Sequence, residues 1–300
     1  MKKKIYLYLT GGLGNQLFQY AVAKNLAIKN QSQLIIDPFS GFLVDFMHKR
    51  TFELNLLNIN NVIFKNSFFL FYLFRIVKKI FKSTKLFYNL FFITIIDEFY
   101  SCYKYQSLVN NFKVKNKLFI LGVFQSEKYF IENKFNIIKE ITPLASYKKK
   151  YLKEAKNISD NNSVAVCVRL HETLPKELQH TAGGIVYFNF YKKALNAILK
   201  KIKNPNFFFF STKSEYIKNL LDGVDEFKKY SYKIITPQEG FKDDIDTLWL
   251  LSCFKNLIIS NSTYYWWGAY FSREKFPKQL VISSKKFPNR DTNLKNWVVL

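Results

Sequence analysis

Three polar clusters in this chain hold residue types that bind a negatively charged group. They are Arg169 to Glu172 (with His171 between them), Ser211-Thr212-Lys213, and Asn261-Ser262-Thr263, and each cluster follows an apolar run. An arginine fork pairs with phosphate oxygens, and a helix start offers unpaired N–H groups with positive partial charge. If the apolar runs are neighbouring parallel strands, their carboxyl ends meet at one edge of a sheet. The sequence therefore predicts one anion site that collects the three clusters.

The last cluster lies in a stretch that reads as strand, turn and helix. Leu257 to Ile259 is too short for a helix and suits a buried parallel strand. The turn supplies an N-cap and hydroxyls where an aromatic helix begins. One interpretation is a phosphate site at that helix start. The other is an ordinary capped helix whose Trp266 and Trp267 lie in the core.

A glycine turn near the start is the second candidate ligand site. Gly11-Gly12-Leu13-Gly14-Asn15-Gln16 lies between an expected strand at 5–9 and a helical apolar pattern from Leu17 onward. Glycines let backbone N–H groups approach a ligand closely. No Gly-Lys-Ser/Thr follows, and Leu17 occupies the third glycine position of a dinucleotide motif, so neither of those signatures is complete. A further strand, 33–37, ends at Asp37.

Composition narrows the class of protein. The 300 residues fit two domains of ordinary size, and 48% are hydrophobic, as in a folded globular chain. The 46 basic and 22 acidic residues give a net charge of +24, which points to a polyanionic partner or a phosphorylated substrate. Nearly all of this charge is lysine, whereas sequence-specific nucleic-acid readers rely on arginine. We therefore expect no nucleic-acid partner. A lysine excess can also reflect coding composition alone.

The cysteines and histidines predict neither disulfides nor a metal site. Three cysteines and three histidines are spread along the chain without paired spacing. This pattern is compatible with a reducing cytosol. The lysine-led start has too short an apolar part for a signal peptide and is interpreted as the first strand.

Residues 62–100 have a distinct, aromatic and lysine-rich composition, and we expect a helical insert there. The two apolar runs, 68–74 and 86–96, are shorter than the roughly 20 residues that span a bilayer. One interpretation is an amphipathic helical segment at a membrane interface. The alternative is a buried helical pair that covers one face of the first domain.

The second half alternates strand and helix patterns. Expected strands at 163–169, 206–210, 232–236, 257–260 and 279–283 are separated by helical patterns such as 187–203, 214–221 and 243–254. This alternation predicts a parallel doubly wound sheet with ligands at the carboxyl ends of its strands. A polar, lysine-rich region at 142–162 marks the junction between domains, which we place at 1–145 and 146–300.

Three ordered motifs carry a family resemblance. GGLGNQLFQYA near the start, GVFQSEKYF in the middle and NSTYYWWGAYF near the end resemble the α-1,2-fucosyltransferases of glycosyltransferase family 11. The resemblance covers roughly 4–37, 118–133 and 163–283 and is poor over the insert. It implies a GT-B fold, an α/β architecture of two Rossmann-like domains facing across a cleft. The 1–145 domain would be the acceptor side, and the 146–300 domain would bind the GDP-sugar donor.

The same resemblance implies the reaction. A GDP-β-L-sugar such as GDP-fucose transfers its sugar, with inversion, to the 2-hydroxyl of a galactoside, and no metal or other cofactor is needed. The donor-binding residues it implies are Gly12, Gly14, Asn15, Gln16, Arg169, Ser211, Asn261, Ser262 and Thr263. Asp37 would touch the acceptor, although an aspartate at a strand end also commonly caps a turn. The acceptor would be a galactoside or a lipid-linked oligosaccharide.

The chain departs from the family's HxRRxD motif. The corresponding run keeps the first arginine as Arg169, but has Cys167, Leu170 and Glu172 at the other three positions. A donor related to GDP-fucose, such as GDP-colitose, would call for altered polar contacts. The alternative interpretation of the altered motif is a protein that binds a nucleotide sugar without catalytic activity.

The catalytic expectations follow from the charge that develops on the departing diphosphate. Arg169 would stabilise that charge together with Ser262 and Thr263 at the helix start. Glu172 is the first candidate base for the acceptor hydroxyl and His171 the second. The charge and the lipid-diphosphate class of substrate lead us to expect a cytoplasmic protein that contacts the inner face of the membrane peripherally.

Overall fold

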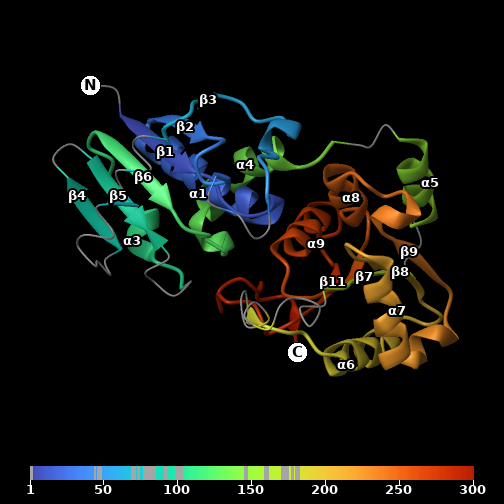
Figure 1. Cartoon of the computed structure of the whole chain (residues 1–300). Helices are drawn as coiled ribbons and strands as arrows, with labels where there is room; N and C mark the ends of the chain where they lie inside the picture. The colour runs from blue at the N-terminus through green and yellow to red at the C-terminus, as the bar shows by residue number, and fades with distance from the viewer. Residues whose placement is uncertain are drawn as a thin grey trace. The chain divides into compact units, whose positions relative to one another are not determined.

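The chain folds into two compact units, Met1–Thr142 and Pro143–Leu300, in a computed structural model (Figure 1). The structure describes residues 3–43, 45, 49–68, 72, 75–76, 86–90, 93–98, 104–144, 148–158, 162–169, 176, 179 and 183–300. Each unit holds one six-stranded sheet with helices packed on it. The expected α/β class, with two Rossmann-like domains, is confirmed.

The first unit has the strand order β3-β2-β1-β6-β5-β4. Its strands are β1 Lys4–Tyr8, β2 Gln33–Asp37, β3 Val62–Phe64, β4 Phe87–Leu90, β5 Ile93–Asp97 and β6 Lys117–Leu121. All neighbours pair in parallel except β4 with β5. Its helical elements are α1 Leu13–Asn30, α3 Ser107–Asn110, α4 Lys134–Ile141, and the 3-10 turns η1 Leu54–Leu56, η3 Glu127–Tyr129 and η4 Ile131–Asn133.

The long helix α1 is buried on nearly all sides, and its buried residues include polar ones such as Gln16, Gln19 and Asn25 as well as apolar ones. It contacts β1, β2 and α4. Gly12, in the glycine turn, is the N-cap residue of the helix, so β1 leads directly through that turn into α1.

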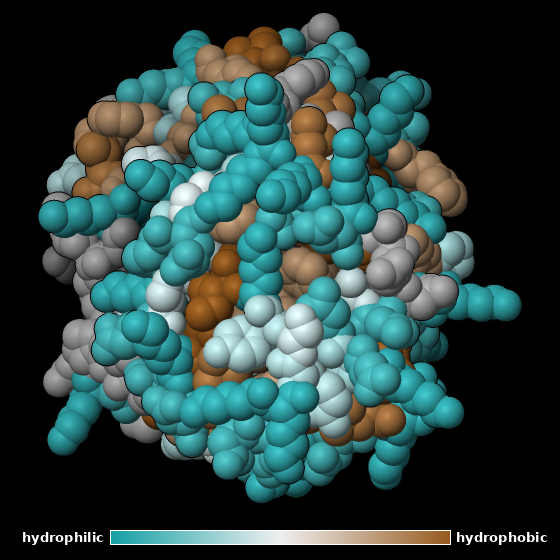
Figure 2. Space-filling model, turned by 90° about the vertical axis from the view of Figure 1, so that its right-hand side faces the viewer, coloured by the Kyte–Doolittle hydropathy of each residue, from teal (hydrophilic) through white to brown (hydrophobic). Residues whose placement is uncertain are grey.

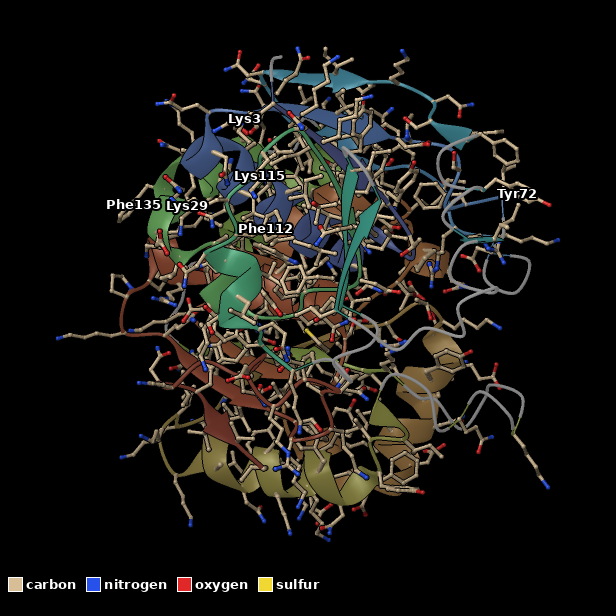
Figure 3. The ribbon with its side chains drawn as sticks, turned by 90° about the vertical axis from the view of Figure 1, so that its left-hand side faces the viewer. Lys3, Lys29, Tyr72, Phe112, Lys115 and Phe135 are labelled. Carbon is tan, nitrogen blue, oxygen red and sulfur yellow. The ribbon has the colours of Figure 1, made fainter. Side chains whose placement is uncertain are left out.

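The helical expectation for the insert is wrong over 62–64, 87–90 and 93–97. These residues form β3 and the antiparallel pair β4 and β5 of the sheet. The reason is the β-branched run Ile93-Thr94-Ile95-Ile96, which favours a strand and buries Ile95 and Ile96 beside β6. The described residues of the first run, Phe68 and Tyr72, are helical, as are Arg75 and Ile76 just after it. Figure 3 shows Tyr72 on the side of this unit opposite to Phe135 and Lys29.

The second unit has the strand order β12-β11-β10-β7-β8-β9, all in parallel. Its strands are β7 Ser163–Cys167, β8 Asn206–Phe210, β9 Tyr232–Ile235, β10 Asn256–Ile259, β11 Leu280–Ser283 and β12 Val298–Val299. Its helices are α5 Lys149–Asn157, α6 Phe188–Leu199, α7 Ser214–Gly223, α8 Asp244–Leu251 and α9 Thr263–Lys275, with 3-10 turns η8 Asp225–Lys229 and η9 Pro237–Glu239. This is the doubly wound dinucleotide-fold order, and its strand order reverses between β7 and β10.

Alternation of side chains divides the core of the second unit into two layers. Val164, Val166, Phe207 and Phe209 share one face with buried residues of α6 and α7. Helices α8 and α9 lie on the other side of the sheet (Figure 1). The face shown in Figure 2 is largely hydrophilic, with hydrophobic side chains between the polar ones.

Candidate functional site

Arg169 and the 261–263 turn lie together at the switch point of the second sheet. Arg169 follows β7, and the turn follows the neighbouring β10. Nη1 of Arg169 donates a hydrogen bond of 3.3 Å to the backbone carbonyl of Asn261. In open α/β sheets, ligands bind at the carboxyl ends of strands where the order reverses. The structure thus brings the predicted guanidinium and the predicted helix start into one place.

The start of α9 presents backbone N–H groups of a kind that can bind an oxyanion. Ser262 is its N-cap residue, and within the described part of the chain its side chain makes no capping hydrogen bond. The first N–H groups of a helix have no partner inside the helix and carry positive partial charge. Thr263 opens the helix and is partly exposed. Ser262 is only 9% exposed, so Thr263 has the more accessible hydroxyl of this helix start.

Trp266 and Trp267 are fully buried, so the core interpretation of this aromatic pair is confirmed. Nε1 of Trp266 donates to the carbonyl oxygen of Thr292 at 2.7 Å. The two tryptophans therefore anchor α9 in the second unit while its first turn stays at the sheet edge. The phosphate-site interpretation of the helix start stays a prediction.

Ser211 and Tyr265 hold the strand ends beneath Arg169. The Ser211 hydroxyl donates to the carbonyl of Val168 at 3.1 Å. The Tyr265 hydroxyl lies 3.3 Å from the carbonyl oxygens of both Val168 and Phe210. Burial raises the pKa of Tyr265 well above its ordinary value, so this phenol remains a hydrogen-bond donor. Sequence reasoning missed Tyr265, whose signal was its place directly after the hydroxyl turn.

Tyr191, on α6, fixes the backbone of Arg169. Its hydroxyl accepts the N–H of Arg169 at 3.4 Å and donates to the carbonyl of Cys167 at 3.3 Å. Cys167 occupies the histidine position of the family motif, and its thiol is buried. Burial raises the pKa of this thiol well above its usual value, so it is a neutral thiol and not a reactive thiolate.

Asn261 joins two loops through its side chain. Its Nδ2 donates to the carbonyl oxygens of Gly184 at 2.9 Å and Lys286 at 3.3 Å. Gly183 has a φ of +88°, and an ideal Cβ there would lie 1.5 Å from the Lys286 oxygen. Only glycine fits so close an approach. The adjacent pair Gly183-Gly184 was the sequence signal for this loop, and it was missed.

The two candidate bases lie outside the described residues. His171 and Glu172 belong to the segment 170–175, so their roles stay predictions.

The glycine turn of the first unit lies at the corresponding point of its sheet, where the order reverses between β1 and β6. Gly11 has a φ of +76°, and Gly14 is buried in the first turn of α1. Asn15 accepts a hydrogen bond of 3.1 Å from Nε2 of Gln125, which follows β6. An ideal Cβ on Gly12 would lie 3.6 Å from Cζ of Arg50, so a guanidinium missed by sequence reasoning stands beside this turn.

Gln16 is fully buried and holds the turn to the loop before η1. Its Nε2 donates to the carbonyls of Gly11 at 3.0 Å and Thr51 at 2.8 Å, and its Oε1 accepts from the N–H of Glu53 at 3.0 Å. These bonds assign Gln16 a positioning role in the turn that contains Gly12 and Asn15.

Asp37, the expected acceptor contact, is a buried turn cap. Its Oδ1 accepts the backbone N–H groups of Phe39 and Ser40, and its Oδ2 accepts from Ser67 N–H and the Ser40 hydroxyl. Asp37 is 2% exposed, and its carboxylate fixes the loops that follow β2 and β3. The turn-cap interpretation therefore describes its observed contacts.

Glu98 is a buried carboxyl at the same edge of the first sheet. Its Oε2 accepts the N–H groups of Val123 at 2.9 Å and Phe124 at 3.2 Å. Desolvation by burial raises its pKa to about 7, against the lowering effect of these two bonds. Glu98 thereby fixes the loop that leads to Gln125, whose side chain donates to Asn15.

The fold defines a class of α/β protein with two Rossmann-like units, each with an arginine near the point where its strand order reverses. Within that class, the family model described as glycosyl transferase family 11 matches residues 4–300, so the chain belongs to that family and is a hexosyltransferase-type glycosyltransferase. This finding confirms the resemblance that the three motifs carry.

Two relatives from Escherichia coli match most of the chain. An alpha-1,2-colitosyltransferase is 29% identical over 274 residues, which cover 87% of this chain and 85% of the relative. The O-antigen biosynthesis glycosyltransferase WbnK is 26% identical over 301 residues, 94% of each chain.

Two solved structures are similar in fold. Fucosyltransferase NodZ from Bradyrhizobium has a TM-score of 0.49 at 11% identity, covering 90% of this chain and 93% of that one. A mutant of FUT1 from Arabidopsis thaliana in complex with GDP has a TM-score of 0.49 at 12% identity, covering 89% and 68%.

Proposed function

We propose that this protein is an inverting glycosyltransferase that moves L-fucose from GDP-β-L-fucose to the 2-hydroxyl of a galactoside during synthesis of a surface polysaccharide or oligosaccharide. Membership of the family over residues 4–300 is the observation that carries the proposal. The naming of one E. coli relative for O-antigen biosynthesis supports the pathway class.

The site chemistry supports transfer from a nucleotide diphosphate. Charge develops on the diphosphate oxygens as the glycosidic bond breaks. The guanidinium of Arg169 and the start of α9, with Ser262 and Thr263, lie close enough to share those oxygens. We propose that these groups, and no metal ion, neutralise the leaving group.

The acceptor oxygen attacks the anomeric carbon from the side opposite to the diphosphate, which inverts the configuration. Glu172 is the proposed base that takes the proton of the acceptor hydroxyl, and His171 is the second candidate. The second unit is the proposed donor-binding domain, and the first the proposed acceptor side.

A colitose donor is the second candidate. Its support is the E. coli colitosyltransferase, which is 29% identical, and the altered motif with Cys167 in place of the family's histidine. A fucose site must hold one more ring hydroxyl than a colitose site, so the two donors separate by their polar contacts.

The deciding experiment is a panel of GDP-fucose, GDP-colitose and GDP-mannose with a galactoside acceptor. GDP release and the linkage of the product, determined by NMR, are measured. Transfer from one of the first two donors to the 2-hydroxyl with inverted configuration is expected. If no GDP-sugar releases GDP with any galactoside, the protein is a binder without transferase activity.

We also propose peripheral contact with the cytoplasmic face of the inner membrane, where a lipid-linked acceptor would be found. Across the described residues, no helix has the length and apolar character needed to cross a bilayer. The net charge of +24 favours an anionic lipid surface. Equal partition between buffer and anionic vesicles at low and high salt would contradict this proposal.

A further inference from the structure

The second sheet has another polar edge, at the amino-terminal ends of its strands. A cavity of about 370 Å³ lies there, and Lys201, Lys203, Lys255 and Lys278 line it. The topology explains why they meet. Strands β8, β7, β10 and β11 are parallel neighbours, so the segments that precede them converge at one edge. Lys203, Lys255 and Lys278 each stand just before one of these strands, and Lys201 follows α6.

The cavity concentrates positive charge. Lys201, Lys203 and Lys278 are exposed, and no ion pair joins any of the three to a carboxylate in the portion of the chain that is described. Lys255 is half-buried. Like charges gathered around a concave surface raise the local positive potential and attract an anion.

A buried glutamine is among the residues that line the same cavity. Gln279 lines it and is only 8% exposed. Its Nε2 and Oε1 are both buried, and neither has a hydrogen-bond partner among the described residues. Ser163, which begins β7, is 2% exposed, and its hydroxyl is likewise without a partner there. Buried polar groups are rarely left unsatisfied in native structures, and a bound oxyanion would accept from the Gln279 amide.

We propose that this cavity is a second anion site, which binds a phosphate or diphosphate group through its lysines and the Gln279 amide. It is separate from the Arg169 site, because β7 runs between the two edges. The five residues of β7 span roughly 16 Å at the usual rise of a β-strand. The phosphate can belong to a soluble molecule or to the headgroup of an anionic lipid, and both present the same oxygens to the lysines.

Pyrophosphate binding to the full chain tests the site. Calorimetric titrations compare the wild type with a triple variant, Lys201→Gln, Lys203→Gln and Lys278→Gln. A matched triple variant, Lys218→Gln, Lys229→Gln and Lys242→Gln, removes the same charge from exposed lysines elsewhere in this unit. The same titrations in an Arg169→Ala background remove binding at the other edge of the sheet. NMR follows the side-chain amide of Gln279 directly.

We expect the cavity variant to lose at least about tenfold in pyrophosphate affinity, the loss of one or more charge-assisted hydrogen bonds. The matched variant should change it by less than about twofold, and the Gln279 amide signal should shift on titration in the Arg169→Ala background. Equal losses in the two triple variants, or a Gln279 signal that does not move, would overturn the site.

Vesicles distinguish the source of the phosphate. Phosphatidylcholine vesicles with and without phosphatidylglycerol are sedimented with each protein. A lipid headgroup is the ligand if the cavity variant, but not the matched variant, loses binding to the anionic vesicles. A soluble phosphate is the ligand if the cavity variant loses only pyrophosphate binding. Because the titration does not depend on glycosyl transfer, it remains informative if the proposed donor proves wrong.

Discussion

The guanidinium of Arg169 donates to the carbonyl oxygen of Asn261 across two neighbouring strand ends, β7 and β10. The two residues are 92 positions apart in the chain. The bond orients the guanidinium at the start of α9, so one positively polarised surface contains both an arginine fork and helix N–H groups.

Replacing this arginine should abolish most of the activity. Arg169→Ala removes the donor that stabilises charge on the departing diphosphate, and we expect turnover to fall roughly 100-fold, about 3 kcal/mol of barrier. Steady-state GDP release measures this. Arg273→Ala is the matched control, since Arg273 stands in the last turn of α9 against the Tyr270 ring. Similar turnover in the two variants would refute the assigned role.

Tyr265→Phe should lower stability more than the same change at its neighbour. The Tyr265 hydroxyl is the buried partner of the Val168 and Phe210 carbonyls, so its loss should cost about 1–2 kcal/mol of unfolding free energy. Tyr264→Phe removes an exposed hydroxyl from the carbonyl of Asp244 and should cost less. Urea titrations of both variants check the order, and an equal or reversed order would show that Tyr265 does not tie the strand ends.

Gly183→Ala should disrupt the loop that Asn261 holds. A Cβ at Gly183 meets the Lys286 carbonyl at 1.5 Å, and the positive φ adds strain, so we expect a loss of at least about 2 kcal/mol. Gly184→Ala is a graded control, because the nearest atom to its Cβ is the Gln179 oxygen at 3.6 Å and only its φ of +77° is strained. Thermal unfolding with and without GDP measures both effects. Equal shifts would mean that the close approach to Lys286 is unimportant.

Glu98 should make stability fall as pH rises. Its pKa is raised from 4.5 to about 7 in the folded protein, so between these values the folded state holds a proton that the unfolded state has released. The contribution of Glu98 to the free energy of unfolding is greatest below pH 4.5. It declines by about 3 kcal/mol as the pH rises to about 7. Glu98→Gln removes the titration, so the difference between variant and wild type should grow over that range in urea titrations. A constant difference would contradict the raised pKa.

Local patterns were sufficient for most elements of the second unit. The expected strand at 206–210 matches β8 residue for residue, and the expected helix at 187–203 contains α6. The helical prediction for the aromatic insert was wrong, because a short apolar run such as Ile93 to Ile96 fits a buried helix as well as a buried strand. Its pairing with β6, which begins at Lys117, settles the choice, and that partner is distant in sequence.

The sequence by itself determined the α/β class, the strand–turn–helix at both ends of the chain and the family, because each depends on residues close together or on ordered motifs. Only the tertiary structure decided which polar residues face a ligand and which hold the scaffold. Gln16 and Asp37 are held by residues of later loops, and Asn261 bridges Gly184 and Lys286. The physical reason is that a side chain's hydrogen-bond partners come from segments that meet only when strands pair, and residue type alone does not say where those segments are.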